Sequence, residues 1–177
     1  MLKRFIHARI RAFERRYDYD AGYLHELADL DGAGLRAFSG AAARLGRRHA
    51  EVPAAAWFGA RLAAMLAEDC GPCTQLTVDM AREAGVDLHT LHALLAGTPD
   101  TAQEDAALGF RFAHAVIDDL PTLAALRCAV VTRYGAAAPA ALGLAVVGAR
   151  LYPPLKRAMG YAGVCTRVTA APAGARD

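Results

Sequence analysis

Residues 69–87 read DCGPCTQLTVDMAREAGVD, and this stretch decides how the rest of the chain is interpreted. Two cysteines, Cys70 and Cys73, stand at its start with Pro72 between them. Apolar side chains then recur at every fourth position, at Leu76, Met80 and Ala84. Gly85 follows them and is a typical helix end. The spacing predicts a helix whose first turn contains the cysteine pair.

The predicted position of the pair favours redox chemistry. A cysteine in the first turn of a helix faces unpaired backbone N–H groups and the positive end of the helix dipole, and both favour the thiolate over the thiol. The two-residue spacing lets one helical turn bring the sulfurs of Cys70 and Cys73 within bridging distance. One thiolate can then attack a peroxide or a disulfide while the other resolves the product. Pro72 suits this turn because it lacks an N–H that would have no partner there.

Two carboxylates, Glu68 and Asp69, directly precede the pair. Negative charge so close would disfavour the thiolate unless one of these side chains accepts its proton. We therefore include Glu68 and Asp69 with Cys70 and Cys73 among the candidate catalytic residues. The alternative role is structural, because a carboxylate near the start of a helix is commonly only a cap.

The rest of the chain has the periodicity of helices. Apolar residues recur at spacings of three and four, and no segment alternates apolar and polar residues as a strand would. Helices are expected near residues 2–13, 23–28, 35–45, 53–68, 72–84, 88–95, 104–120, 123–134 and 142–147. Thr101, followed by Glu104, predicts a capping box before the long helix that starts there. Thioredoxins use the same tetrapeptide, but they need a strand before it, so a thioredoxin fold is rejected.

These features predict an all-α fold, a single-domain helical bundle. At 177 residues one hydrophobic core is large enough to be stable. We expect N-terminal helices at residues 1–50 to pack on a helical core at residues 51–167, which is followed by a flexible tail at residues 168–177. The first helix is basic and amphipathic, as expected for packing on the core; the alternative is that it lies on an anionic membrane.

Composition excludes several classes of protein. Hydrophobic residues make up 55% of the chain and charged residues 21%, which excludes a disordered chain, and the excess of alanine predicts helices with small, closely packed faces. A net charge of +2 does not indicate a nucleic-acid partner. The basic start lacks the apolar core of a secretory signal, and the longest apolar run, residues 135–149, is interrupted by Pro139. We therefore expect no membrane partner and a cytoplasmic location.

The other cysteines and the histidines do not form a recognisable site. Cys128 and Cys165 are single and far apart, whereas zinc would need two more ligands beside the pair, so we expect no metal and no cofactor. Both are interpreted as small buried residues. His89 and His92 are expected to be solvated or to cap a helix. His114 lies in an apolar segment and is expected to be a hydrogen-bonded core residue.

Residues 69–87 resemble the core motif of the alkylhydroperoxidase D-like (carboxymuconolactone decarboxylase) family. That motif is a C-x-x-C that opens a helix and is closed by Ala-x-x-x-Gly-Val/Leu, here residues 81–86. The likeness includes the Leu-rich helix that follows and the segment at residues 152–160, and it covers about residues 53–165. It implies an all-helical fold of that type, a homo-oligomer such as a trimer or hexamer, and reduction of hydroperoxides or related thiol chemistry at the two cysteines.

Two positions depart from the pattern of the family's peroxidases. Those peroxidases have a histidine four residues after the second cysteine, where this chain has Thr77, and a glutamate twelve residues before the first, where it has Phe58. The side chains that would relay protons are therefore absent, and only the two cysteines are matched. Thr77 joins Glu68 and Asp69 as a possible substitute.

The function expected on these grounds is a dithiol redox protein that reduces small hydroperoxides or disulfides and is recharged by an unknown reductant. By analogy with the family, Cys73 attacks first, whereas thioredoxin-like use of the tetrapeptide would make it Cys70. The alternative is a binding protein on the same scaffold, which holds a small hydrophobic ligand beside a dithiol whose proton relay has been lost. A lactone decarboxylase or isomerase would not need paired cysteines.

Overall fold

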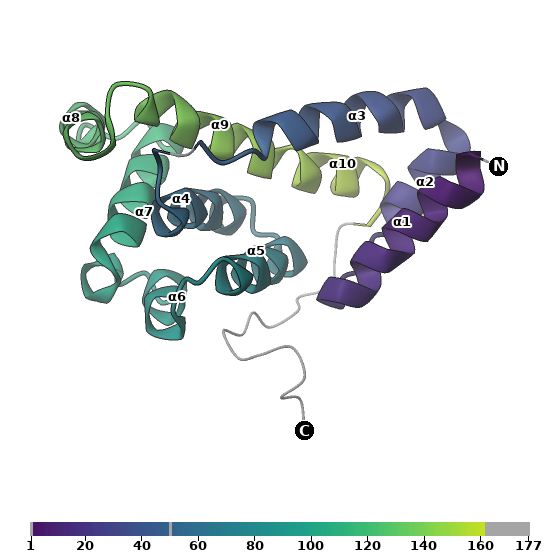
Figure 1. The fold of residues 1–177 in the computed structure, drawn as a ribbon, viewed down its shortest axis with the longest axis horizontal. Helices are drawn as coiled ribbons and strands as arrows, with labels where there is room; N and C mark the ends of the chain where they lie inside the picture. The colour runs from purple at the N-terminus through teal and green to yellow at the C-terminus, as the bar shows by residue number, and fades with distance from the viewer. Residues whose placement is uncertain (1, 50, 162–177) are drawn as a thin grey trace.

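The structure, a computed structural model, describes residues 2–49 and 51–161. Within these ranges the chain forms helices joined by turns, and no strand is present (Figure 1). The predicted all-α fold class is therefore confirmed. The expected tail at residues 168–177 and Cys165 lie outside the described residues. The helices are α1 (Leu2–Tyr17), α2 (Gly22–Leu30), α3 (Gly32–Leu45), α4 (Ala54–Ala67), α5 (Gly71–Glu83), α6 (Leu88–Leu95), the 3-10 turn η1 (Pro99–Thr101), α7 (Glu104–Ile117), α8 (Leu123–Tyr134), α9 (Ala138–Arg150) and α10 (Tyr152–Ala158).

Helix α4 lies at the centre of the fold (Figure 1). It packs most extensively on α7 and also on α5 and α9, and most of its side chains are buried in the main hydrophobic core. Its sequence, AAAWFGARLAAMLA, contains one charged residue, Arg61. A helix that is apolar on nearly every side can be surrounded by other helices. The chain leaves α4 through Glu68 and Asp69 and reaches the cysteine pair directly.

Two glycines allow the backbones of α4 and α7 to touch. A Cβ atom placed on Gly59 would overlap the carbonyl oxygen of Ala106, and one placed on Gly109 would overlap that of Ala56. Only a residue without a side chain fits at either position. The small, closely packed helix faces that the alanine excess predicts are therefore confirmed at this crossing.

The helix that contains the dithiol begins as predicted. Cys70 is the N-cap of α5, Gly71 is its first residue and Pro72 lies in its first turn. Asp69, which separates α4 from α5, has a positive φ of 49°. Gly85, after the end of α5, has a φ of +88°, the left-handed conformation that glycine adopts without strain.

The prediction at the start of α7 is wrong in its detail. No capping box forms, because the Thr101 hydroxyl donates to the carbonyl of Thr98 within η1 at 3.0 Å. The N-cap of α7 is Gln103, whose backbone N–H donates to the hydroxyl of Thr90 at 3.0 Å. The proline of η1 tightens the chain into a 3-10 turn and moves Thr101 out of capping position. Helix α10, with prolines in its first turn, was not predicted either.

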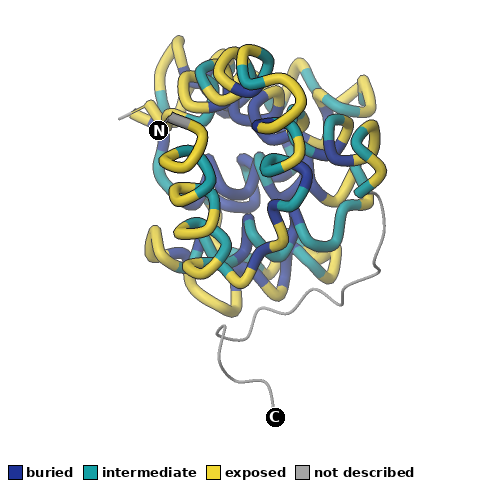
Figure 2. Tube along the Cα trace, turned by 90° about the vertical axis from the view of Figure 1, so that its right-hand side faces the viewer, coloured by how far each residue is buried: buried dark blue, intermediate teal, exposed yellow. Residues whose placement is uncertain are grey.

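The N-terminal helices form a second, smaller hydrophobic cluster. Its buried members are Tyr19, Ala21 and Tyr23. Partly buried residues of the same helices and of other parts of the chain pack on it: Ile10, Phe13, Tyr17, Leu24, Leu76, Leu155, Met159 and Tyr161. Figure 2, seen from the side of α1 and α2, shows exposed residues on the outer turns and buried residues inside. Because Leu76 belongs to α5, this cluster connects α1 and α2 to the helix of the dithiol.

Two expected core residues are exposed. His114 has a side chain that is 53% exposed and is paired with Asp118. Cys128 is exposed on α8, a helix with one buried residue, Val130. Both predictions took local apolar sequence as a sign of burial. Cys128 is exposed because α8 lies at the periphery of the bundle (Figure 1), and His114 lies on the side of α7 that faces solvent together with Asp118. His89 and His92 are exposed, as expected.

In the described part of the chain no single helix has the length and apolar character to cross a membrane. One pair of helical segments, Leu123–Tyr134 and Ala138–Ala158, passes by length and composition when taken together, but the two are bent by 113°.

Candidate active site

The structure pairs Cys70 and Cys73 as a disulfide, with their Cα atoms 5.3 Å apart. The backbone carbonyl of Cys70 accepts hydrogen bonds from the N–H of Thr74 at 2.8 Å and from its hydroxyl at 2.9 Å. These contacts fix the first turn of α5. Cys73 is 4% exposed, whereas Cys70 is only partly buried. The two sulfurs therefore have different access to solvent.

Cys73 lies on the wall of a cavity of about 390 Å³. The cavity is enclosed by residues of α1, α2, α3, α4, α5, α9 and α10, so that the N-terminal helices form one side of it. Most of its lining is apolar: Phe13, Leu24, Phe38, Met65, Leu76 and Met80. Its volume is at the lower end of the ~300–1,000 Å³ typical of small-molecule sites. The buried sulfur therefore faces a space of ligand size.

One group near Cys73 can stabilise negative charge on its sulfur. The hydroxyl of Tyr19 lies 3.9 Å from Cys73 Sγ. Burial raises the pKa of Tyr19, so this phenol keeps its proton at neutral pH and can donate it in a hydrogen bond. The Nζ atom of Lys156, a buried residue, lies 5.1 Å from the centre of the Tyr19 ring. Burial lowers the pKa of Lys156, and the charge of Asp20 opposes this shift.

The lining of the cavity includes a cation, Arg61. Its Cζ atom lies 4.6 Å from the centre of the Trp57 ring. Its Nε atom is buried and has no hydrogen-bond partner among the described residues. Burial lowers the pKa of Arg61, and the nearby phenol of Tyr152 acts in the opposite direction. The cavity is therefore apolar with positive charge at its wall.

The structure places the predicted site residues in two groups. Thr77 is buried and lines the cavity with Cys73, and its hydroxyl donates to the carbonyl of Cys73 at 2.9 Å. Glu68 and Asp69 do not line the cavity. Glu68 accepts from Arg150 Nε and from an Arg157 nitrogen, both at 2.6 Å.

The surroundings of Glu68 give it a structural role. Burial would raise the pKa of this carboxyl, but the hydrogen bonds from Arg157 and Arg150 outweigh it and hold the pKa below its ordinary value. A carboxylate so engaged is a poor proton acceptor for a cysteine. Asp69 is exposed in the turn between α4 and α5.

Sequence reasoning missed Tyr19, Arg61 and Lys156. Arg61 had a recognisable signal, since it is the one charged residue of an otherwise apolar helix. Tyr19 had none, because it reaches the site from a distant part of the chain, and Lys156 packs on the Tyr19 ring without lining the cavity. Phe58, at the position of the family's glutamate, is buried edge-on against Trp57 with ring centres 4.8 Å apart and does not line the cavity.

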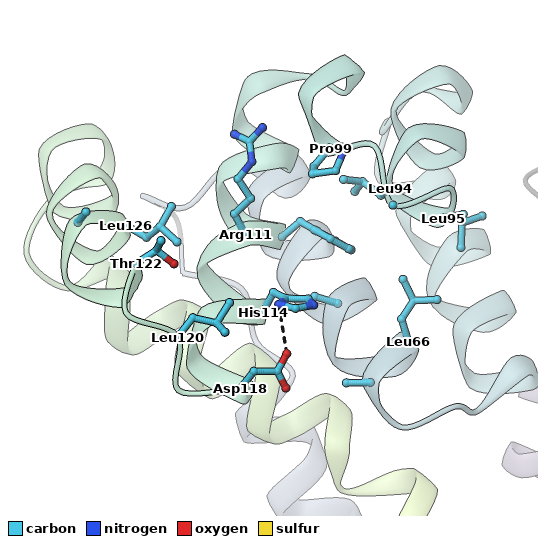
Figure 3. A pocket seen from close by; sticks show the side chains of 15 residues that line it. Leu66, Leu94, Leu95, Pro99, Arg111, His114, Asp118, Leu120, Thr122 and Leu126 are labelled. Carbon is cyan, nitrogen blue, oxygen red and sulfur yellow. Dashed lines mark ion pairs between the residues drawn. The ribbon is translucent and has the colours of Figure 1, made fainter.

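A larger hollow of about 890 Å³ lies between α4, α6, α7 and α8 (Figure 3). Its walls include Leu66, Leu94 and Leu126, and its polar groups include His114, whose Nδ1 lies 3.2 Å from a carboxylate oxygen of Asp118. No cysteine lines it. Over the described ranges, no three histidine, cysteine or acidic side chains gather in a way that could hold a metal ion. Of these two hollows, the smaller one has a cysteine, Cys73, in its lining.

Compared with protein-family models, with curated proteins and with solved structures, the chain matches none of them. The resemblance to the alkylhydroperoxidase D-like family thus remains a prediction from residues 69–87.

Proposed function

We propose that the protein is a dithiol oxidoreductase that reduces organic hydroperoxides or disulfides through Cys70 and Cys73. One observation supports this above all: a cysteine pair within bonding distance opens a helix, and one of its sulfurs faces a ligand-sized cavity beside a phenol. The resemblance of residues 69–87 to the alkylhydroperoxidase D-like motif supports the same chemistry.

In the proposed reaction, Cys73 attacks first because it is the sulfur that lines the cavity. Its thiolate attacks the terminal oxygen of a hydroperoxide, an S–O bond forms and the O–O bond breaks. The alkoxide leaves and takes up a proton, which gives the alcohol. Tyr19 is placed to donate a hydrogen bond to negative charge at this point.

Cys70 then resolves the product. Its thiolate attacks the sulfenic acid on Cys73, the disulfide forms, and the hydroxide that leaves is protonated to water. Two electrons have passed from the two thiols to the peroxide. A dithiol reductant returns two electrons and two protons, and partly exposed Cys70 is the sulfur that such a reductant reaches more easily. A disulfide substrate would follow the same exchange without the sulfenic acid.

The test uses a protein in which Cys128 and Cys165 are replaced by serine, so that the pair supplies the only thiols. The reduced protein receives one equivalent of cumene hydroperoxide while peroxide loss is followed and disulfides are mapped by peptide mass spectrometry. We expect fast loss with a Cys70–Cys73 bridge, no fast loss with Cys73→Ser, and one trapped sulfenic acid with Cys70→Ser. Peroxide loss no faster than with a free thiol would refute peroxidase activity.

A second candidate function is binding without turnover. It is favoured by Thr77 and Phe58, which stand where the family's peroxidases have proton-relay residues, and by the apolar lining of the cavity. In that case the reduced pair would react with peroxide at the rate of a free thiol, while a small apolar ligand would still bind. The homo-oligomer implied by the resemblance belongs to the proposal in either form, and light scattering would show a multiple of 18.7 kDa.

A further inference from the structure

We propose that the cavity beside Cys73 binds an apolar organic acid whose carboxylate pairs with Arg61. The ligand class follows from two features of the wall: a partly buried arginine whose Nε atom is buried without a hydrogen-bond partner, and a predominantly apolar surface. The proposal that the cavity binds an organic acid stands on its own. The proposal that such an acid is the substrate rests on the proposed dithiol chemistry.

The first feature is the isolation of Arg61. Among the described residues, the buried side-chain polar atoms without a hydrogen-bond partner are Arg61 Nε and Trp57 Nε1, one helical turn apart on α4. Buried polar groups in proteins are nearly always hydrogen-bonded, and buried charges are nearly always paired.

Other arginines of the chain show the usual arrangement. Arg133 pairs with Asp105 at 2.6 Å, and Arg150 and Arg157 each pair with Glu68 at 2.6 Å. Arg61 forms no ion pair with a carboxylate in the described part of the chain, although it is partly buried. A guanidinium held in this way is suited to a carboxylate that arrives with a ligand, because its planar fork matches two carboxylate oxygens.

The second feature excludes small inorganic anions as the preferred ligand. Phe13, Phe38 and Met65 line the cavity, and contact with them is favourable only for apolar surface. A phosphate or sulfate ion would lose hydration without gaining such contact. An aliphatic or aromatic chain that ends in a carboxylate satisfies both the cation and the walls.

Anchoring at Arg61 would also place a substrate. Arg61 and Cys73 line the same cavity, so a molecule held by its carboxylate has its apolar part enclosed near the sulfur. If the proposed chemistry is right, the substrate is an organic hydroperoxide that also bears a carboxylate. Binding energy from the anchored end would then lower the barrier at the reacting end.

The test measures binding of octanoate and of its uncharged counterpart 1-octanol by calorimetry. The fluorescence of Trp57, the chain's single tryptophan, gives an independent readout, because this ring stacks on Arg61. We expect Arg61→Met to weaken octanoate binding by about tenfold or more, which corresponds to the loss of one charge-assisted pair, and to leave 1-octanol unchanged. Arg61→Lys keeps the charge and should give an intermediate affinity.

The matched control is Arg9→Met, since Arg9 is an exposed arginine on the rim of the same cavity. It should change octanoate affinity by less than about twofold, as expected for a screened surface charge. The inference is overturned if wild type does not bind octanoate, if Arg61→Met binds it equally well, or if Arg9→Met has the larger effect. Circular dichroism verifies that each variant is folded.

Because octanoate is inert to thiols, this result does not depend on turnover. Combining this titration with the peroxide assay on the wild-type protein separates the two proposals: octanoate binding without fast peroxide reduction refutes the dithiol chemistry alone. Fast reduction of cumene hydroperoxide without octanoate binding refutes the organic-acid site alone. Where both hold, Arg61→Met should lower kcat/KM for a carboxylated hydroperoxide and leave that for its methyl ester unchanged.

Discussion

The two sulfurs of the dithiol have different environments although they are three residues apart. Cys70, the N-cap of α5, is partly exposed at the turn from α4, while Cys73 is buried against the cavity with the Tyr19 hydroxyl 3.9 Å away. One helical turn therefore presents one sulfur to solvent and the other to an enclosed space. This asymmetry is what a division of labour between peroxide attack and recharging requires.

Arg61 is expected to reduce the stability of the protein without ligand. Replacing it by methionine, which keeps an apolar stem of similar reach, should raise the free energy of unfolding by about 1 kcal/mol. The cost of holding a partly buried charge without a carboxylate partner exceeds the ~0.5–1 kcal/mol of attraction to the Trp57 ring. Urea unfolding followed by circular dichroism measures the change.

The control for this prediction is Arg133→Met. Arg133 is paired with Asp105 and Glu104, so its replacement should lower stability. If Arg61→Met and Arg133→Met are destabilising to the same degree, Arg61 has a favourable partner and the prediction is wrong.

Glu68 should make stability depend on pH in the acid range. Its pKa in the folded protein is lowered by Arg157 and Arg150, so its contribution is complete above the ordinary value near ~4.3 and is lost as pH falls through the lower folded value. We expect Glu68→Gln to cost about 1–2 kcal/mol at pH 7, because the arginines are half-exposed, and progressively less as the pH falls below the ordinary carboxyl pKa. Urea unfolding at pH 7, 5 and 3 gives the comparison.

The matched control is Glu51→Gln, at an exposed position, which should leave the free energy of unfolding unchanged at each pH. A difference between wild type and Glu68→Gln that persists at pH 3 would show that shape, rather than charge, is responsible.

At this scale the sequence identified the cysteine pair but not the residues that surround it. The cysteine pair was recognised from its spacing and from the helix it opens, which are local properties. Glu68 and Asp69 were chosen by proximity along the chain, yet Glu68 faces arginines of α9 and α10. The direction of a side chain in a turn depends on partners that are distant in the sequence, and the neighbouring residues do not reveal which partners these are.

At the scale of the helices, the crossing of α4 and α7 depends on two glycines. We expect Gly109→Ala to lower the free energy of unfolding by ~3 kcal/mol or more, because the added methyl would overlap the backbone carbonyl of Ala56 and force the helices apart. Thermal and urea unfolding would measure the loss.

Gly143→Ala is the matched control. Gly143 lies within α9, and a Cβ atom placed on it would have no atom within 4 Å. This substitution should stabilise the protein by ~0.5–1 kcal/mol through helix propensity. Equal effects of the two substitutions would show that the helices yield at the crossing.

The helices themselves were largely predictable, because their period of three to four residues is written in the chain. The errors fall where short-range rules compete. The proline of η1 places Thr101 in a 3-10 turn instead of a cap, and α10, which was not predicted, begins with prolines that the first turn of a helix tolerates. In both cases the local structure depends on where proline stands within the first turn.

On the scale of the whole molecule, the candidate site is completed by the part of the chain that gave the least sequence signal. Tyr19, Phe13 and Phe38 come from the first fifty residues, and they close the cavity over Cys73 of α5. Such a contact joins segments more than thirty residues apart, so no local pattern indicates it. The cavity could be found only once the helices were placed in space.

The bundle is also uneven in how firmly its helices are held. Helix α4 is buried on nearly every side, whereas α8 has one buried residue, Val130, and is tied to α7 near its end by Arg133 and Tyr134, both of which bind Asp105. Regions with few buried contacts open at lower free energy than the core. Native-state hydrogen exchange should therefore show amides of α8 exchanging ~100-fold or more faster than those of α4.

Asp105→Ala provides the decisive variant, because it removes the shared partner of Arg133 and Tyr134. It should speed exchange in α8 and leave exchange in α4 unchanged. The control is Asp100→Ala, which removes a residue of η1 that pairs with Arg111 of α7 and should not affect exchange in α8. If α8 and α4 exchange at one common rate, the molecule opens as a single unit and α8 is not a separate element. A slow α8 would instead mean that this helix is covered in solution, as assembly into an oligomer would do.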